Sequence, residues 1–227
     1  MYIIAKPPRL KGVESIVQNG LLEEYRFDES SGDVLIGYKN GYHGTFGSDN
    51  NKPARLRNGV LFSTDDFIIL PNQIRDMLSV SKSFTVITVG LISTGTILGS
   101  TISSTDRMTI NVSPVGLARG NLYNIANYNI SSQETMPNVP NIISYLSDNT
   151  KSKLFVNKDN FRNGIQSATP GPTVACKIGV RTTNSVPLEG ILYYMLFYTR
   201  FLTDSEVLRN CRVIKSILKL RGVIVGD

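Results

Sequence analysis

The chain of 227 residues has no tryptophan, a single histidine and only two cysteines. Any Ser-His-Asp or Cys-His catalytic scheme would depend on His43, which lies in a glycine-flanked turn with no cysteine near it in the sequence. Cys176 and Cys211 show no zinc-type spacing and pair only if the fold brings them together, so we expect two partly buried free thiols. Phosphate-binding glycine loops are also missing, which argues against nucleotide chemistry.

Long apolar runs are missing as well. The longest, Ile191–Tyr198, is far shorter than the roughly 20 residues of a membrane-spanning helix. The stretch from Met1 to Gly20 lacks the apolar centre of a signal peptide. We therefore expect a chain that neither crosses a membrane nor carries a cleaved signal, and its few cysteines fit assembly in a reducing cytoplasm.

The formal charge of +6 is concentrated at the two ends of the chain. The N-terminal excess predicts a basic arm, residues 1–18, that docks to a partner subunit. The C-terminal excess has the spacing of a solvated helix face without interleaved aromatic residues, so nucleic acid is not an expected partner. The residues responsible are Lys6, Arg9 and Lys11 at one end, and Arg200, Arg209, Arg212, Lys215, Lys219 and Arg221 at the other.

Between the ends, short runs rich in Thr, Val and Ile alternate with Gly, Asn, Asp, Ser and Pro, as in an all-β sandwich. Phe84–Ile92 and Ile97–Ile102, for example, indicate two separate strands. Ile191–Tyr198 is apolar on both faces, which predicts a central strand covered by the core on one side and by a helix on the other.

The predicted helix spans residues 204–221. Thr203-Asp204-Ser205-Glu206 forms a capping box at its start, and Gly222 supplies the stop. An apolar stripe at helical spacing faces the core, and Arg212, Lys215 and Lys219 lie largely outside it. The stripe consists of Val207, Leu208, Cys211, Ile214, Ile217 and Leu218.

Several motifs, taken in order, resemble the concanavalin A-like lectin/glucanase superfamily in its laminin G-like form. They are Asn19-Gly20-Leu21-Leu22 with Tyr25-Arg26-Phe27-Asp28, Asn40-Gly41-Tyr42-His43-Gly44-Thr45, Asn58-Gly59-Val60-Leu61-Phe62, Lys153-Leu154-Phe155-Val156-Asn157, and Phe197-Tyr198-Thr199-Arg200-Phe201-Leu202 leading into the capping box. The resemblance implies an antiparallel two-sheet jelly-roll sandwich with one C-terminal helix packed on it, as a single domain over residues 19–227. The same form occurs in structural proteins of tailed bacteriophages.

The chain lacks the paired carboxylates that the superfamily's glycoside hydrolases carry along one strand, so we expect no enzymatic activity and no catalytic residue. The nearest acidic cluster indicates a solvated rim, with a calcium site as the alternative, and no cofactor is otherwise expected. His43 is expected to play a structural role, its ring hydrogen-bonded to backbone as the family turn implies. The cluster comprises Glu23, Glu24, Asp28, Glu29 and Asp33.

Carbohydrate sites combine aromatic rings, which stack on the apolar faces of sugars, with amides that bind hydroxyl groups. The loop Asn121–Asn129 holds both kinds of side chain, and Tyr123, Asn124, Tyr128 and Asn129 are its candidate sugar-binding residues. The alternative is a polar loop without a ligand.

Together these features predict a virion structural protein of a tailed bacteriophage, in the capsid, tail or fibre. We expect it to assemble in the host cytoplasm with other virion proteins and as a homo-oligomer, with adhesion to a host-surface glycan as a further role. The alternative function is a carbohydrate-binding module of a bacterial surface protein.

Overall fold

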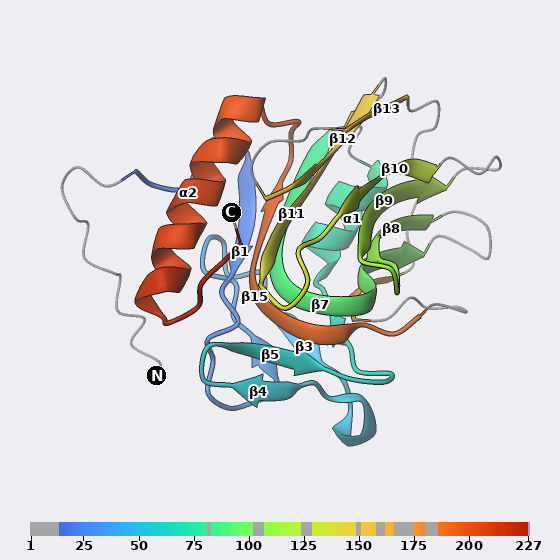
Figure 1. Cartoon of the computed structure of the whole chain (residues 1–227). Coiled ribbons are helices and arrows are strands. Elements are labelled where there is room, and N and C mark those ends of the chain that lie inside the picture. The colour runs from blue at the N-terminus through green and yellow to red at the C-terminus, as the bar shows by residue number, and fades with distance from the viewer. Residues whose placement is uncertain are drawn as a thin grey trace.

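A computed structural model describes residues 14–80, 83–101, 107–123, 129–148, 151–157, 162–165, 175–179 and 186–226. Within these ranges the strands pair antiparallel throughout and form one 15-stranded sheet (Figure 1). In chain order the strands are β1 (Leu21–Tyr25), β2 (Val34–Leu35), β3 (Gly44–Phe46), β4 (Ala54–Leu56), β5 (Gly59–Phe62), β6 (Ile68–Ile69), β7 (Phe84–Thr101), β8 (Arg107–Val112), β9 (Leu117–Tyr123), β10 (Asn129–Glu134), β11 (Asn141–Ser147), β12 (Lys151–Val156), β13 (Arg162–Ile165), β14 (Ala175–Ile178) and β15 (Glu189–Tyr198).

The sheet curls because β7 runs through both of its halves. Its first part pairs with β11 and β15, and the part from Gly95 onward pairs with β8 and β14. Gly95 has φ 104°, and the ladder shifts register next to it, between Thr96 and Leu98. The predicted all-β class is confirmed, but the predicted two-sheet jelly roll is not. Ser93–Thr96 resembles a turn in sequence, yet the chain bends there without leaving the sheet.

Helix α1 (Asn72–Val80) lies inside the curl (Figure 1). Apolar side chains fill the rest of the interior. Ile74, Met77 and Leu78 of α1 are buried at helical spacing, and the Pro71 carbonyl accepts hydrogen bonds from the first turn of the helix. The sequence interpretation missed this short helix. The signal that indicates it is the spacing of these three apolar residues just after a proline.

Strand β15 is buried on both faces, as its sequence predicted. Leu192, Met195 and Phe197 belong to the apolar cluster inside the curl. Tyr194 and Tyr198 belong to a second cluster on the outer face, under helix α2 (Asp204–Leu220). The strand pairs with β7 along one edge and with β1 and β5 along the other. Both its edges are therefore hydrogen-bonded, and the two clusters cover its faces.

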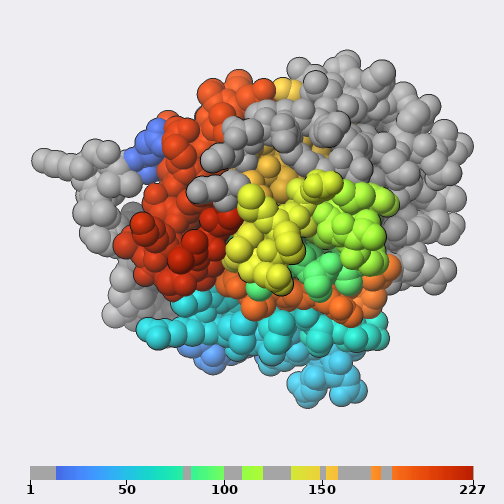
Figure 2. Space-filling model, viewed as in Figure 1, coloured from blue at the N-terminus to red at the C-terminus, as the bar shows by residue number. Residues whose placement is uncertain are grey.

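Helix α2 begins at the predicted Asp204 and ends at Leu220, one residue before the predicted end. Thr203 and Glu206 make both hydrogen bonds of the capping box. At the other end Gly222, with φ 80°, lets its own N–H donate to Lys219 O and the N–H of Val223 donate to Leu218 O, which is a Schellman closure. No helix among the described residues is long and apolar enough to span a membrane. In Figure 2 the red surface of α2 lies beside the cyan surface of β4 and β5.

The described part of the predicted arm, residues 14–18, packs against α2. Ile16 and Val17 are buried in the outer cluster. A closed ring of buried hydrogen bonds holds them: Val17 N donates to Asn210 Oδ1, Asn210 Nδ2 to Tyr198 Oη, and Tyr198 Oη to Val17 O, each at 2.9 Å. Residues 1–13 lie outside the described residues.

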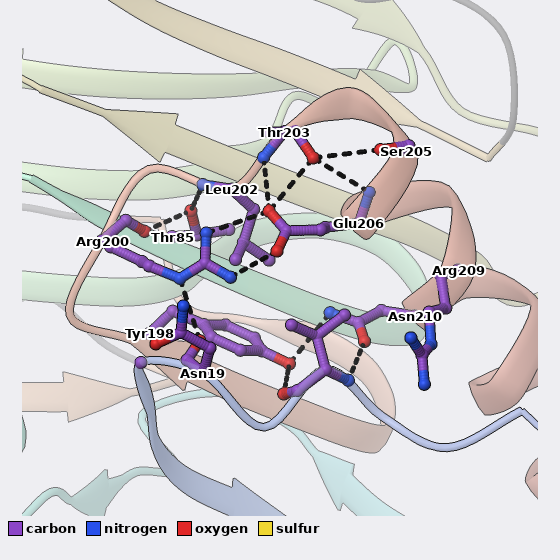
Figure 3. Close-up of polar contacts among 12 residues, drawn as sticks. Asn19, Thr85, Tyr198, Arg200, Leu202, Thr203, Ser205, Glu206, Arg209 and Asn210 are labelled. Carbon is purple, nitrogen blue, oxygen red and sulfur yellow. Dashed lines mark hydrogen bonds and ion pairs between the residues drawn. The ribbon is translucent and has the colours of Figure 1, made fainter.

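A second polar network fixes the start of α2 (Figure 3). The Arg200 guanidinium donates to both carboxylate oxygens of Glu206, at 2.9 and 2.5 Å, and its Nε donates to Asn19 O at 2.9 Å. Thr85 Oγ1 donates to Arg200 O and accepts from Leu202 N, at 2.8 and 3.1 Å. The last motif of the family resemblance is therefore a joint between the central strand and the helix.

This joint predicts a pH dependence of stability. The Arg200 hydrogen bonds lower the pKa of Glu206 from 4.5 to about 2, against the opposing effect of burial. The folded-state pKa is lowered, so the stabilisation is complete above about pH 4.5 and is lost as the pH falls towards 2. We expect Glu206→Gln to be less stable than the parent in urea at pH 6, with the gap narrowing between pH 4.5 and pH 3. A gap independent of pH would contradict this role for the ion pair.

Candidate glycan-binding surface

The carboxylate of Glu23 organises the loop formed by residues 37–43. The side chain is fully buried, and Glu23 is the central residue of β1. Its oxygens accept hydrogen bonds from four backbone N–H groups, those of Glu24 (2.9 Å), Lys39 (2.6 Å), Asn40 (3.1 Å) and Tyr42 (2.9 Å). A buried carboxylate with this many donors is a structural anchor, because its charge is compensated by fixed backbone dipoles.

Further contacts hold the same loop. Tyr25 Oη donates to Tyr42 O at 2.6 Å, and Asn40 Nδ2 donates to Leu22 O at 2.6 Å. Gly37 N donates to His43 Nδ1 at 3.0 Å, which confirms the predicted hydrogen bond between the histidine ring and backbone. A Cβ on Gly37 would lie 2.7 Å from the Glu23 carboxylate, so this position admits only glycine without rearrangement. The loop is therefore rigidly placed.

Arg26, Asp28 and Tyr38 form a partly exposed cluster, here called the Arg26 cluster, beside this loop. The Arg26 guanidinium carbon lies 4.3 Å from the centre of the Tyr38 ring, and the Tyr38 hydroxyl donates to Asp28 Oδ1 at 2.8 Å. Arg26 Nε donates to Glu24 Oε1 at 2.8 Å. The backbone places Tyr38 here because its N–H donates to Glu24 O, beside the bridge between Tyr25 and Gly37.

Some donors and acceptors of the Arg26 cluster are not used by hydrogen bonds to the described residues. Asp28 Oδ2 makes no hydrogen bond to any residue that the structure describes. The Arg26 guanidinium bonds Glu24 and also interacts with the Tyr194 hydroxyl, and these two groups do not use all five of its N–H donors. The Arg26 side chain is 23% exposed, so water or a ligand reaches it. Burial and the bond to Asp28 raise the pKa of Tyr38, which keeps its hydroxyl a donor at neutral pH. Burial works to lower the pKa of Arg26, but the Glu24 carboxylate outweighs it and the pKa is raised.

The backbone between the two charged residues is strained. Phe27 is fully buried and has φ 53°, in the left-handed region that aromatic residues rarely occupy. Such outliers persist only where the surroundings over-determine them, and they gather at functional sites. Here the unusual φ ends the regular course of β1 and sets Asp28 against the Tyr38 hydroxyl.

Arg221, the C-terminal cap of α2, binds the backbone next to the Arg26 cluster. Its guanidinium donates to the carbonyl oxygens of Arg26 (2.9 Å), Tyr193 (3.4 Å) and Asn58 (2.8 Å). Asn58 Nδ2 returns a hydrogen bond to Arg221 O at 2.6 Å. The end of β1, the β4–β5 turn and the helix terminus therefore meet at one point, and burial lowers the pKa of Arg221.

The predicted solvated acidic rim is wrong for three of its five residues. Glu23, Glu24 and Glu29 are buried and engaged by donors of the protein. Burial raises the pKa of Glu29, whose Oε1 accepts from Ile36 N at 2.8 Å. Within the described ranges no three His, Cys, Asp or Glu side chains gather as a metal ion would require. The sequence could not reveal this burial, because most of the donors are distant in the chain: the 37–43 loop for Glu23, Tyr194 for Glu24 and Ile36 for Glu29.

The predicted sugar-binding loop lies largely outside the described residues. Asn124 and Tyr128 fall there entirely, as do the side chains of Tyr123 and Asn129. Tyr123 is the last residue of β9, and Asn129 is the first residue of β10. These two strands pair antiparallel. These four residues stay a prediction.

The two cysteines are free and buried, as predicted. Cys176 belongs to the apolar cluster inside the curl, and Cys211 belongs to the one under α2. They are thus on opposite faces of the sheet and do not pair. Burial raises the pKa of both thiols, that of Cys211 to about 12.

No known protein family matches the sequence, and no curated protein does. Solved structures do share the fold. Domain 4 of AbnA, an extracellular GH43 arabinanase from Geobacillus stearothermophilus solved in complex with arabinotriose, matches with a TM-score of 0.68 and 16% identity, over 85% of this chain and 98% of that one. The Ruminococcus gnavus IT-sialidase CBM40 bound to α2,3-sialyllactose matches with a TM-score of 0.51 and 16% identity, over 58% of this chain and 83% of that one.

Trypanosoma rangeli sialidase matches with a TM-score of 0.67 and 14% identity, over 90% of this chain and 34% of that one. The chain thus spans about a third of the length of this enzyme. The prediction that the chain is not an enzyme is contradicted by this match. The prediction depends on the absence of the carboxylate pair that most glycoside hydrolases use. Sialidases instead use a tyrosine nucleophile, so the absence of that pair does not exclude them. At such identities the matches show the fold, which is that of sialidase-like β domains and carbohydrate-binding modules.

Proposed function

We propose that this chain is a carbohydrate-binding module and that it binds glycans at the Arg26 cluster. The observation that carries the proposal is a partly exposed group of three side chains: Arg26 stacks on the Tyr38 ring, and Asp28 accepts from the Tyr38 hydroxyl while its second oxygen has no partner among the described residues. Sugars require this combination, because their ring faces are apolar and their hydroxyl groups both donate and accept.

Two features of the structure favour binding at this surface. The 37–43 loop that presents Tyr38 is held by the buried Glu23 carboxylate, so little ordering entropy is lost when a ligand binds. The fold supports the proposal as well, because its neighbours include an arabinanase domain solved with arabinotriose and a CBM40 solved with α2,3-sialyllactose.

A glycan array with the full chain tests the proposal. We expect binding to at least one neutral glycan and a loss of at least about tenfold in affinity for Tyr38→Ala, because the stacking ring is removed. Phe67→Ala is the matched control, since Lys177 stacks on Phe67 at 4.1 Å in a similar cation–aromatic pair elsewhere on the molecule. Equal loss in both variants, or none in Tyr38→Ala, would reject the Arg26 cluster.

The β9–β10 loop is the second proposed sugar site. If it binds the glycan, the double variant Tyr123→Ala with Tyr128→Ala loses binding while Tyr38→Ala keeps it. The same array separates the two sites, because each variant leaves the other surface unchanged.

The role in a phage virion stays a prediction, as do the virion and cytoplasmic location, the virion partners and the homo-oligomer. None of the three solved structures described above comes from a bacteriophage. The division into an arm of residues 1–18 and a domain of residues 19–227 also stays a prediction. The burial of Ile16 and Val17 bears on it, because deleting residues 1–18 would uncover part of α2.

A further inference from the structure

The charges around the Arg26 cluster balance. Arg26 is paired with the Glu24 carboxylate at 2.8 Å, and Asp28 adds a second negative charge beside it. Arg221 supplies the second positive charge, but its guanidinium nitrogens are directed to the carbonyl oxygens of Arg26, Tyr193 and Asn58. A ligand at the cluster therefore meets one arginine already neutralised by an acid, and one carboxylate with a free oxygen.

This arrangement distinguishes neutral from acidic sugars. Two adjacent hydroxyl groups match it well, because one donates to Asp28 Oδ2 while the other accepts from a terminal nitrogen of Arg26. A carboxylated sugar would bring its negative charge next to the Asp28 carboxylate. Like charges a few ångströms apart near a protein surface repel appreciably. Neither nearby cation is placed to bind the acidic group instead, because Arg26 is paired with Glu24 and the Arg221 guanidinium is directed to three backbone carbonyl oxygens.

We infer that the Arg26 cluster selects a neutral sugar with two adjacent free hydroxyl groups and rejects its carboxylated counterpart, with Asp28 as the residue that discriminates. This inference depends on the proposed function, since it names the class of glycan bound at the same surface. Asp28 binds one hydroxyl of the sugar and orients the Tyr38 ring through the phenol hydrogen bond.

The test uses two pairs of probes that differ in acidity: lactose against α2,3-sialyllactose, and galactose oligomers against galacturonic acid oligomers. Affinities are measured by calorimetry with the full chain at low ionic strength. We expect the neutral member to bind at least about tenfold more tightly in the pair that is recognised. Preference for the acidic member would overturn the inference while leaving carbohydrate binding intact.

Asp28→Asn isolates the charge. The amide keeps an oxygen that accepts from the Tyr38 hydroxyl, so the ring stays in place while the negative charge is removed. We expect the preference for the neutral sugar to shrink at least about fivefold, with a smaller loss of neutral binding. Asp49→Asn, at an exposed residue in the short 3-10 helix Asp49–Asn51, is the control for a general charge effect. An unchanged preference in Asp28→Asn overturns the role of Asp28.

Tyr38→Ala distinguishes glycan binding at the Arg26 cluster from the selection of neutral sugars by Asp28. Loss of the neutral ligand in this variant together with a weakened preference in Asp28→Asn supports both. Absence of binding to every probe by the unmodified chain counts against the proposed function itself.

Discussion

Gly95→Ala is expected to destabilise the fold by about 4 kcal/mol or more, enough to unfold a domain of ordinary stability. An added Cβ at Gly95 would lie 1.8 Å from the carbonyl oxygen of Pro187 and 2.5 Å from its carbonyl carbon. Those atoms are backbone and cannot rotate away. The residue also has φ 104°, which L side chains rarely adopt. Urea unfolding followed by circular dichroism measures the effect.

Gly41→Ala is the matched control for this experiment. Gly41 also has a positive φ, 74°, but nothing lies within 4 Å of an added Cβ. We expect a loss of about 1 kcal/mol, from the backbone conformation alone. If the two variants lose the same stability, the close approach of Pro187 is not what fixes glycine in β7.

Glu23→Gln is expected to cost about 3 kcal/mol and to loosen the 37–43 loop. The replacement keeps the size of the side chain but turns one acceptor oxygen into an NH₂ group. That group would face either the backbone N–H of Lys39 or those of Asn40 and Tyr42. Of these three, only Asn40 N–H has a contact with the other carboxylate oxygen, and it is longer, at 3.4 Å. Unpaired donors in a buried site, together with the lost charge, account for the expected size of the effect.

Two measurements follow Glu23→Gln. Urea unfolding gives the stability, and amide hydrogen exchange at residues 37–43 reports the loop directly. Glu189→Gln, at an exposed glutamate on β15, is the control and should stay within about 0.5 kcal/mol of the parent. Loop amides that exchange as slowly in Glu23→Gln as in the parent would show that the carboxylate does not hold the loop.

The sequence predicted the features that local chemistry decides. The capping box at Thr203, the glycine stop at Gly222 and the doubly buried strand Ile191–Tyr198 each follow from a short segment, and each is confirmed. The hydrogen bond between His43 and backbone is confirmed as well.

Features that depend on long-range pairing were not predictable in the same way. The sequence predicts two strands where β7 is continuous, because the polar Ser93–Thr96 stretch with its glycine resembles a turn. The Arg26 cluster was missed because Tyr38 reaches Arg26 only through the bridge between Tyr25 and Gly37. The sequence predicts solvated acids at Glu23 and Glu24, whereas both are buried, because Tyr42 and Tyr194, which donate to them, lie in distant parts of the chain.

Because β7 contributes to both halves of the curl, neither half has a boundary strand of its own at which the molecule can divide. Unfolding of one half of the sheet therefore removes hydrogen bonds and apolar contacts from the other half as well. Denaturation is therefore expected as a single all-or-none event, with the most slowly exchanging amides gathered along that shared strand.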